Sequence, residues 1–395
     1  MNLIKMNLSK IKSIIILFLA VLTIYQTGFL WFFNITGHTF LLNYFPFMQQ
    51  VPVPEGAYNL VMPKRIIAAH KDGRFSVLYN GLQQADSFKY SHMVLSDMFQ
   101  RGRFVAVHTA GLEAMLAFLG SQLYIYEYAF SMEAEWFTFG FGERGNVLTR
   151  PGVGSFRQII ICPPAYGETD IRIFFLCESG YAYEFAVALT DDIPRHNVGA
   201  EAIGAYYTFE DGKFIRYSHF YGIAVSNPYA DAHGAFSLSF IQDRVSGFFS
   251  NPAAIRDMAA DDVWVYRDVN TVVRYYVTHV LEYISYRAVD RSAPSLFLND
   301  YIAAFQFIER DHLIINEMYL ARHREENGRR IFYFNYVVGN MPLTMPDNWP
   351  ENAPLIYPIV VTVEHGTVIR YRKIAFNFYA THHDEGESHW INFQG

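Results

Sequence analysis

The sequence predicts an α+β protein in which an N-terminal transmembrane helix precedes three extracellular domains of curled antiparallel sheets and packed helices. Three observations lead to this fold class. Hydrophobic residues make up 51% of the 395-residue chain and charged residues only 17%, so the chain can bury several cores. Aromatic residues account for 17%, which suits half-buried sheets, and short alternating segments recur between turns and helical patterns.

An uncharged stretch near the N-terminus predicts a membrane anchor. Residues 13–33 carry no charged side chain and are about as long as a bilayer-spanning helix must be. The preceding residues, 1–12, hold lysines and no acid, so the positive-inside rule places them in the cytoplasm. A cleaved signal peptide is the alternative, but no small-residue cleavage site follows. We therefore expect a single-pass protein of the cell membrane, with the bulk of the chain outside the cell.

Polar residues within this stretch are candidates for contact with a partner in the membrane. Thr23, Gln26 and Thr27 are spaced three or four positions apart, which places them near one face of a helix. Polar side chains in a membrane helix tend to face other helices. Threonine is also well tolerated in such helices, and Gln26 lies near the outer interface, so both interpretations remain open.

The first extracellular domain is expected over residues 36–192, and it begins with a linker over 36–56 that is rich in Phe, Asn and Pro. Its predicted elements are a strand–turn–strand unit over 64–80, short helices over 90–100 and 109–120, and strands over 123–130, 157–164, 170–178 and 181–189. Cys162 and Cys177 fall near opposite ends of a predicted hairpin, whereas a disulfide requires Cα atoms within about 7 Å. We therefore expect two buried free thiols.

Two further domains, over 200–290 and 295–395, share a plan in which a helix precedes a curled antiparallel sheet. Helical patterns over 234–249 and 296–310 begin these sheets, and strands follow over 263–286, 329–339, 355–373 and 374–382. The charged segment 321–330 is predicted to be an exposed loop. Glu364-His365-Gly366 is predicted to be a hairpin turn, with glycine supplying a positive φ.

The segment "FFSNPAAIRDM", residues 248–258, holds no side chain that suggests chemistry. We expect Phe248 and Phe249 to be buried. Asn251 is expected to cap a short helix whose first turn contains Pro252. The segment is therefore predicted to be a scaffold for the strands that follow it.

Candidate reactive or ligand-binding motifs are weak. The G-x-G-x-x-G match over 140–145 is followed by Pro151 and glycines, which prevent the helix that a dinucleotide site needs. His382, His383 and His389 are metal-ligand residue types, but a solvated tail explains them more simply. Signatures of a catalytic nucleophile are missing from the sequence, and the net charge of −7 argues against nucleic-acid binding. We expect no catalytic residue, cofactor or resident metal.

Several segments resemble the YycH family. The likeness rests on a Phe pair with an Asn-Pro turn, a Tyr-containing meander that ends in Leu-Glu-Tyr, and closing segments over 332–343 and 360–373 that look like those shared with the related YycI proteins; residues 62–75 also fit. The chain departs from the family at 278–279 and over 310–318. The residues that carry the likeness are Phe248, Phe249, Asn251, Pro252, Arg256, Leu281, Glu282, Tyr283 and Gly366.

The resemblance implies a non-enzymatic regulator in bacterial signal transduction. Such proteins are anchored in the membrane of Gram-positive-type bacteria and modulate a two-component sensor histidine kinase that governs cell-wall metabolism. The implied partners are this kinase, a second anchored regulator of YycI type and the membrane, contacted through the transmembrane helix and the extracellular domains. The alternative function is an anchored envelope enzyme, or a module that binds a metal or another ligand.

Overall fold

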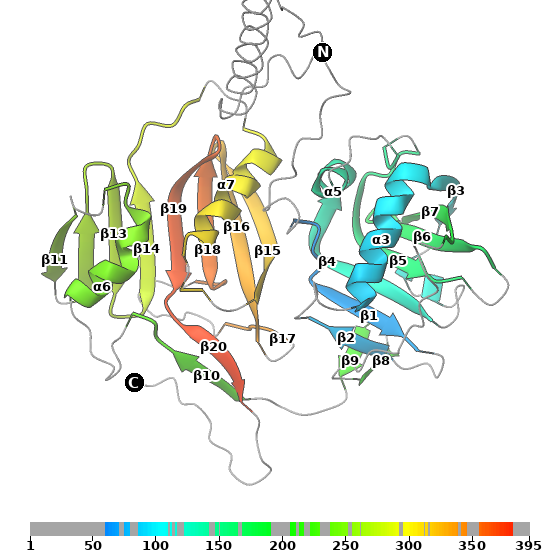
Figure 1. Ribbon diagram of the computed structural model, residues 1–395, viewed down its shortest axis with the longest axis horizontal. Coiled ribbons are helices and arrows are strands. Elements are labelled where there is room, and N and C mark those ends of the chain that lie inside the picture. Colours follow the sequence, from blue (N-terminus) through cyan, green and yellow to red (C-terminus); the bar gives the residue numbers. More distant parts are fainter. Residues whose placement is uncertain are drawn as a thin grey trace, which may run out of the picture. The chain divides into compact units, whose positions relative to one another are not determined.

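Two antiparallel sheets dominate the protein, as the computed structural model shows in Figure 1. The structure describes residues 60–381 except 71–74, 80–85, 110, 113–114, 117–121, 142–146, 150, 165–167, 191–205, 211–212, 217–221, 230–237, 252–254, 261, 292–294, 312, 315–316, 339–340 and 346–354. The predicted anchor over 13–33, with Thr23, Gln26 and Thr27, lies outside these residues, as do His382, His383 and His389. Among the described helices, none has the length and apolar character to cross a membrane.

The first sheet has the strand order β3-β7-β6-β5-β4-β1-β2-β8-β9. Its strands are β1 (Arg65–Ala69), β2 (Phe75–Leu78), β3 (Arg103–Thr109), β4 (Leu123–Glu133), β5 (Ser155–Cys162), β6 (Asp170–Cys177), β7 (Tyr181–Ala188), β8 (Tyr206–Glu210) and β9 (Lys213–Arg216). The strands predicted from alternation in this region are confirmed. Both cysteines are free thiols, as predicted, but they are only half-buried.

Helices α3 (Asp86–Arg101) and α5 (Ala134–Gly140) pack with this sheet. Helix α3 buries a stripe that starts with small serines, Ser87 and Ser91, and continues through Val94, Leu95 and Met98. This spacing of three and four is the pattern that predicted the helix. Helix α5 was not predicted, because its short, aromatic-rich sequence also suits a strand.

The second sheet joins strands from both of the predicted later domains. Its order is β11-β12-β13-β14-β19-β18-β16-β15, with β17 paired to β16, and a separate pair is formed by β10 (Gly222–Ser226) and β20 (Asn377–Thr381). The strands are β11 (Arg256–Ala260), β12 (Val263–Arg267), β13 (Thr271–Tyr276), β14 (Val280–Ser285), β15 (Glu317–Glu326), β16 (Arg329–Val338), β17 (Met341–Pro342), β18 (Ile359–Glu364) and β19 (Thr367–Ile374). The junction is the antiparallel pair β14–β19. The helix-then-sheet plan of each half is present, whereas the domain boundaries stay predictions.

Helices α6 (Leu238–Val245) and α7 (Phe297–Glu309), and the short helix η4 (Ser246–Phe248), pack with this sheet. Figure 1 shows α6 and α7 on the same side of it. Aromatic contacts fix the side: the Phe307 ring of α7 lies 4.6 Å from that of Tyr283 and 5.3 Å from that of Tyr371. The helices predicted over 234–249 and 296–310 are thus confirmed.

Two local predictions in this sheet are wrong. Residues 256–260 form strand β11 and pair with β12, rather than continuing a helix from Asn251; Pro252 lies outside the described residues. The charged segment 321–330 is the tip of the β15–β16 hairpin and not a loop. Its turn is Asn327-Gly328, with φ values of 53° and 73°, the two positive values that a tight hairpin turn requires.

Candidate functional site

The side chains of the Leu-Glu-Tyr sequence in β14 point alternately to the two faces of the second sheet. Successive residues of a strand point to opposite faces, so Leu281 and Tyr283 share one face and Glu282 lies on the other. Tyr283 meets helix α7 through Phe307, and Leu281 is buried in the same core. Glu282 instead meets arginines of the neighbouring strands. The resemblance motif therefore contributes to two different environments.

The helix-covered face collects aromatic rings around Phe248. Its ring centroid lies 6.1 Å from that of Tyr283, 5.7 Å from that of Phe307 and 5.9 Å from that of Tyr371. Phe248 and Phe249 are both buried, as the sequence predicted. Such ring pairs stabilise a core by about 0.5–1.5 kcal/mol beyond their buried area. The Phe pair therefore has a structural role, because it packs η4 against the sheet and α7.

The opposite face holds a buried acid among arginines. Glu282 is only 3% exposed. Its carboxylate accepts hydrogen bonds from Arg370, through Nε at 2.9 Å and also through Nη2, and from Arg274 at 3.2 Å and the Tyr276 hydroxyl at 3.1 Å. Burial alone would raise the pKa of Glu282, but the hydrogen bonds and charges of these arginines lower it below its ordinary value. Glu282 is therefore held as a carboxylate.

The strand register extends this cluster into two cross-strand rows, which we call the arginine face. The first row, from β12 to β15, is Arg267, Val272, Ile284, Arg370, Thr362, Ile331 and Arg324. The second row is Val265, Arg274, Glu282, Arg372, Val360, Tyr333 and Arg322. Apart from the buried Glu282, these side chains are half-buried or exposed. Burial and the charge of Arg370 lower the pKa of Arg372, as expected where cations gather.

Gly366, another residue behind the resemblance, anchors helix α7. It lies in the β18–β19 turn with φ of 72°, next to His365 at 47°, so the predicted hairpin turn is confirmed. Its backbone N–H donates to Asp300 Oδ1 at 2.6 Å. Asp300, which is fully buried in α7, also accepts from Ser295 Oγ at 2.8 Å and from Arg330 Nη1 at 2.6 Å.

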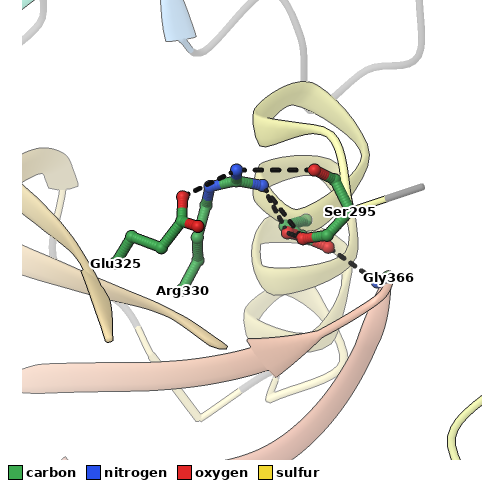
Figure 2. Close-up of polar contacts among 5 residues, drawn as sticks. Ser295, Glu325, Arg330 and Gly366 are labelled. Carbon is green, nitrogen blue, oxygen red and sulfur yellow. Dashed lines mark hydrogen bonds and ion pairs between the residues drawn. The ribbon is translucent and has the colours of Figure 1, made fainter. Parts of the chain in front are cut away.

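Figure 2 shows how Arg330 connects this network to the β15–β16 hairpin. Arg330 donates to Glu325 Oε2 at 2.9 Å and to the Ser295 carbonyl oxygen at 3.5 Å. The network thus links the start of α7, the β18–β19 turn and the β15–β16 hairpin. It fixes α7 on the sheet through charge-assisted hydrogen bonds, which is a structural role.

A second buried ion pair lies on the face of the sheet that the helices cover. Lys373 Nζ is 2.5 Å from Asp311 Oδ2, and each side chain is 2% exposed. The Tyr371 hydroxyl donates to the same carboxylate oxygen at 3.0 Å, and the lysine lies 4.9 Å from the centre of the Tyr229 ring. Burial lowers the pKa of Lys373, and the charge and hydrogen bond of Asp311 oppose that shift.

A small cleft lies where β14, α7 and the β18–β19 turn meet. Its volume is about 210 Å³, and its lining residues are Tyr283, Ser285, Arg287, Ala303, Gln306, Phe307, Arg310, Gly366, Thr367 and Val368. Two of the residues behind the resemblance, Tyr283 and Gly366, are among them. The lining carries two arginines and no acid, so its chemistry suits a small anion more than a cation.

Two other residues behind the resemblance, Asn251 and Arg256, lie between η4 and β12. Asn251 is exposed after η4, and Arg256 begins β11 opposite Arg267. Within the described part of the chain, no group of three or more His, Cys, Asp or Glu side chains is arranged to hold a metal. Sequence reasoning missed the arginine face, although the alternation Arg370-Tyr371-Arg372 signalled a strand with cations on one side.

Comparison with known proteins gives one structural likeness. No protein-family model matches the sequence, and no curated protein matches it. Among solved structures, the chain is similar to the crystal structure of YycH from Bacillus subtilis, with a TM-score of 0.49 and 11% sequence identity over 81% of this chain and 82% of that one. YycH is also the family whose segments the sequence resembles.

Proposed function

We propose that the chain is a membrane-anchored, non-enzymatic modulator of a two-component sensor histidine kinase that governs cell-wall metabolism. In this proposal residues 1–12 are cytoplasmic, residues 13–33 span the membrane and the rest of the chain is extracellular. The anchor contacts the kinase's membrane helices through Thr23, Gln26 and Thr27. The extracellular domains bind the kinase or a second anchored regulator of YycI type.

The observation that carries the proposal is the role of the residues behind the resemblance. Phe248 and Tyr283 pack against α7. Glu282 of β14 pairs with arginines of the two flanking strands, β13 and β19, and Gly366 anchors α7 through Asp300. These residues come from distant segments and support one sheet. A sequence pattern that marks a scaffold rather than reactive side chains is typical of a protein that acts by binding.

Isolation of the full chain from its native membranes tests this function. An affinity-tagged chain should bring down a sensor histidine kinase and a second single-pass regulator, identified by mass spectrometry. Replacing residues 13–33 with an unrelated hydrophobic helix should change kinase output while the extracellular part still folds. A chain that isolates without any kinase, and whose anchor can be replaced without changing kinase output, would contradict the proposal.

The cleft favours a second candidate function, that of a module which binds a small anionic ligand. Arg287 and Arg310 supply the positive charge, and Tyr283 and Phe307 supply an apolar wall. A panel of small phosphates and carboxylates should then raise the thermal midpoint of the purified chain, and Arg287→Ala should remove the effect. Metal analysis of the same sample tests whether His382, His383 and His389 retain an ion. No thermal shift and no bound metal would remove this candidate.

A further inference from the structure

The arginine face concentrates positive charge on one face of the second sheet. Its two rows contain arginines at Arg267, Arg274, Arg322, Arg324, Arg370 and Arg372, and Glu282 is their one acid. Glu282 is buried, whereas the Arg370 side chain is 52% exposed and that of Arg274 is 37% exposed. The surface that solvent meets is therefore cationic, on a chain whose net charge is −7.

Helices α6 and α7 leave this face uncovered, because both lie on the other side of the sheet (Figure 1). The residues between the arginines are mainly apolar or β-branched: Val265, Val272, Ile284, Ile331, Val360, Thr362 and Tyr333. A sheet with one face packed on a core normally exposes mixed polar side chains on its other face. Here the exposed face combines half-buried apolar side chains with an excess of positive charge, since among the described residues Glu326 next to Arg324 is the one exposed acid that pairs with the row arginines. This is the composition of a surface that a partner covers.

The kind of cation indicates the kind of partner. Neither row contains a lysine. Arginine presents a planar fork that pairs with carboxylates through two parallel hydrogen bonds and packs against apolar groups. Protein interfaces are enriched in arginine and tyrosine and depleted in lysine, whereas surfaces that attract anionic membranes use lysine and arginine together as point charges. The composition therefore favours carboxylates on a protein surface over a lipid surface.

The spacing of the arginines sets the dimensions of the complementary surface. In the first row, Arg267, Arg370 and Arg324 follow one another at three inter-strand spacings, with two strands between each pair. Neighbouring strands lie about 4.8 Å apart, so these cations repeat at about 14 Å. The second row brings Arg274 and Arg372 to either side of Glu282. A partner that presents several carboxylates over about 30 Å would match this pattern.

We propose that the arginine face binds an acidic surface segment of an extracellular partner protein. The inference deepens the proposed function and rests on it, because it states how such a partner is held. Carboxylates of the partner pair with the exposed arginines, while the apolar side chains between them are covered. Glu282 keeps the central guanidinium groups in place, so it is a positioning residue rather than part of the contact surface.

A charge-reversal pair tests the face. The variant Arg267→Glu/Arg322→Glu changes two exposed arginines that lie away from Glu282. The control, Lys89→Glu/Arg244→Glu, makes the same change in net charge on exposed helical residues. In detergent-purified full chain, poly-L-glutamate should bind the control like the unaltered chain. The variant should bind it about tenfold more weakly, because each reversed charge replaces an attraction to the polyanion with a repulsion. Raising the salt concentration should weaken the remaining binding.

Isolation of each variant from native membranes distinguishes a failure of this inference from a failure of the proposed function. If a kinase or second regulator is isolated with the unaltered chain and the control but not with the variant, both stand. If the variant retains these partners, the arginine face is not the docking surface, although the function survives. If no kinase is isolated while poly-L-glutamate binding still depends on Arg267 and Arg322, the proposed function fails and the acidic-partner surface stands.

Two other outcomes would overturn the choice of partner. Binding to phosphatidylglycerol vesicles but not to poly-L-glutamate, with the same loss in the variant, would identify a lipid surface. Binding that appears only after deletion of residues 382–395, which contain Asp384, Glu385 and Glu387, would make the chain's own acidic segment the occupant. Circular dichroism of each variant checks that the change in binding does not arise from unfolding.

Discussion

Replacing Glu282 with glutamine is expected to destabilise the second sheet by about 2–4 kcal/mol. The carboxylate accepts two hydrogen bonds from Arg370, one from Arg274 and one from Tyr276, and hydrogen bonds to charged groups contribute about 1.5–3 kcal/mol each. The arginine side chains are 52% and 37% exposed, so water replaces part of what they lose. Glutamine keeps the shape of the side chain but leaves the guanidinium groups without their buried counter-charge.

Urea unfolding of the purified chain measures this effect. Glu326→Gln is the matched control, because Glu326 also pairs with an arginine, Arg324 at 2.6 Å, but both side chains are about half exposed. An exposed pair contributes about 0–1 kcal/mol, so the control should unfold near the unaltered midpoint. A Glu282→Gln chain that is no less stable than the control would refute the view that a buried acid holds the arginine face together.

The pH dependence of the unfolding free energy provides an independent check that the Glu282 carboxylate stabilises the fold. The folded-state pKa of Glu282 lies below its ordinary value of 4.5, so the unfolded state binds more protons as the acid range is entered. The stability that Glu282 contributes is therefore fully present above about pH 5 and is lost as the pH falls through the folded pKa. The difference in unfolding free energy between the unaltered chain and Glu282→Gln should shrink in that window.

Three further predictions concern other described features. Lys373→Met should cost about 3–5 kcal/mol in urea unfolding, because it leaves the buried Asp311 side chain without its ionic partner. Adding Asp311→Leu to this variant should recover at least half of the loss, and a double variant as unstable as the single would contradict this. Gly366→Ala should cost about 1–2 kcal/mol because its φ is 72°, while Gly154→Ala, which has open space and no such φ, should have little effect. Burial raises the pKa of Cys162 to about 12, so its thiol should react with a disulfide reagent at pH 8 far more slowly in the folded chain than in urea, and equal rates would show that the thiol is accessible.

Elements with a strong local period were predictable from the sequence. Helices α3, α6 and α7 repeat apolar residues every three or four positions, and strands such as β6 and β18 alternate or run apolar between turn residues. The β15–β16 hairpin was misread because its tip is charged. Its Asn327-Gly328 turn was a stronger signal than the composition, since few other residue pairs adopt two successive positive φ values.

The arrangement of the second sheet could not be predicted from local patterns. Strands β14 and β19 pair although Glu282 and Arg372 are 90 positions apart in the chain. The local sequence of either segment does not specify which strand it pairs with. The short strand β11 likewise depends on pairing with β12. The same limit applied to the candidate site: Leu-Glu-Tyr was recognised as a motif, but its cationic surroundings depend on which strands flank it.

The register explains why an acid is present in the middle of a cationic face. Arg274 and Arg372 would lie directly opposite an uncharged residue if position 282 were apolar, and Arg370 is the diagonal neighbour. These like charges lie on the two strands that flank β14 and repel one another, so a cluster of this kind needs one buried counter-charge between them. Leu281 and Tyr283, on the two sides of Glu282, are committed to the core beneath α7. The three residues therefore couple the packing of the sheet to the charge that its other face presents, and a change at position 282 is expected to alter both stability and partner binding.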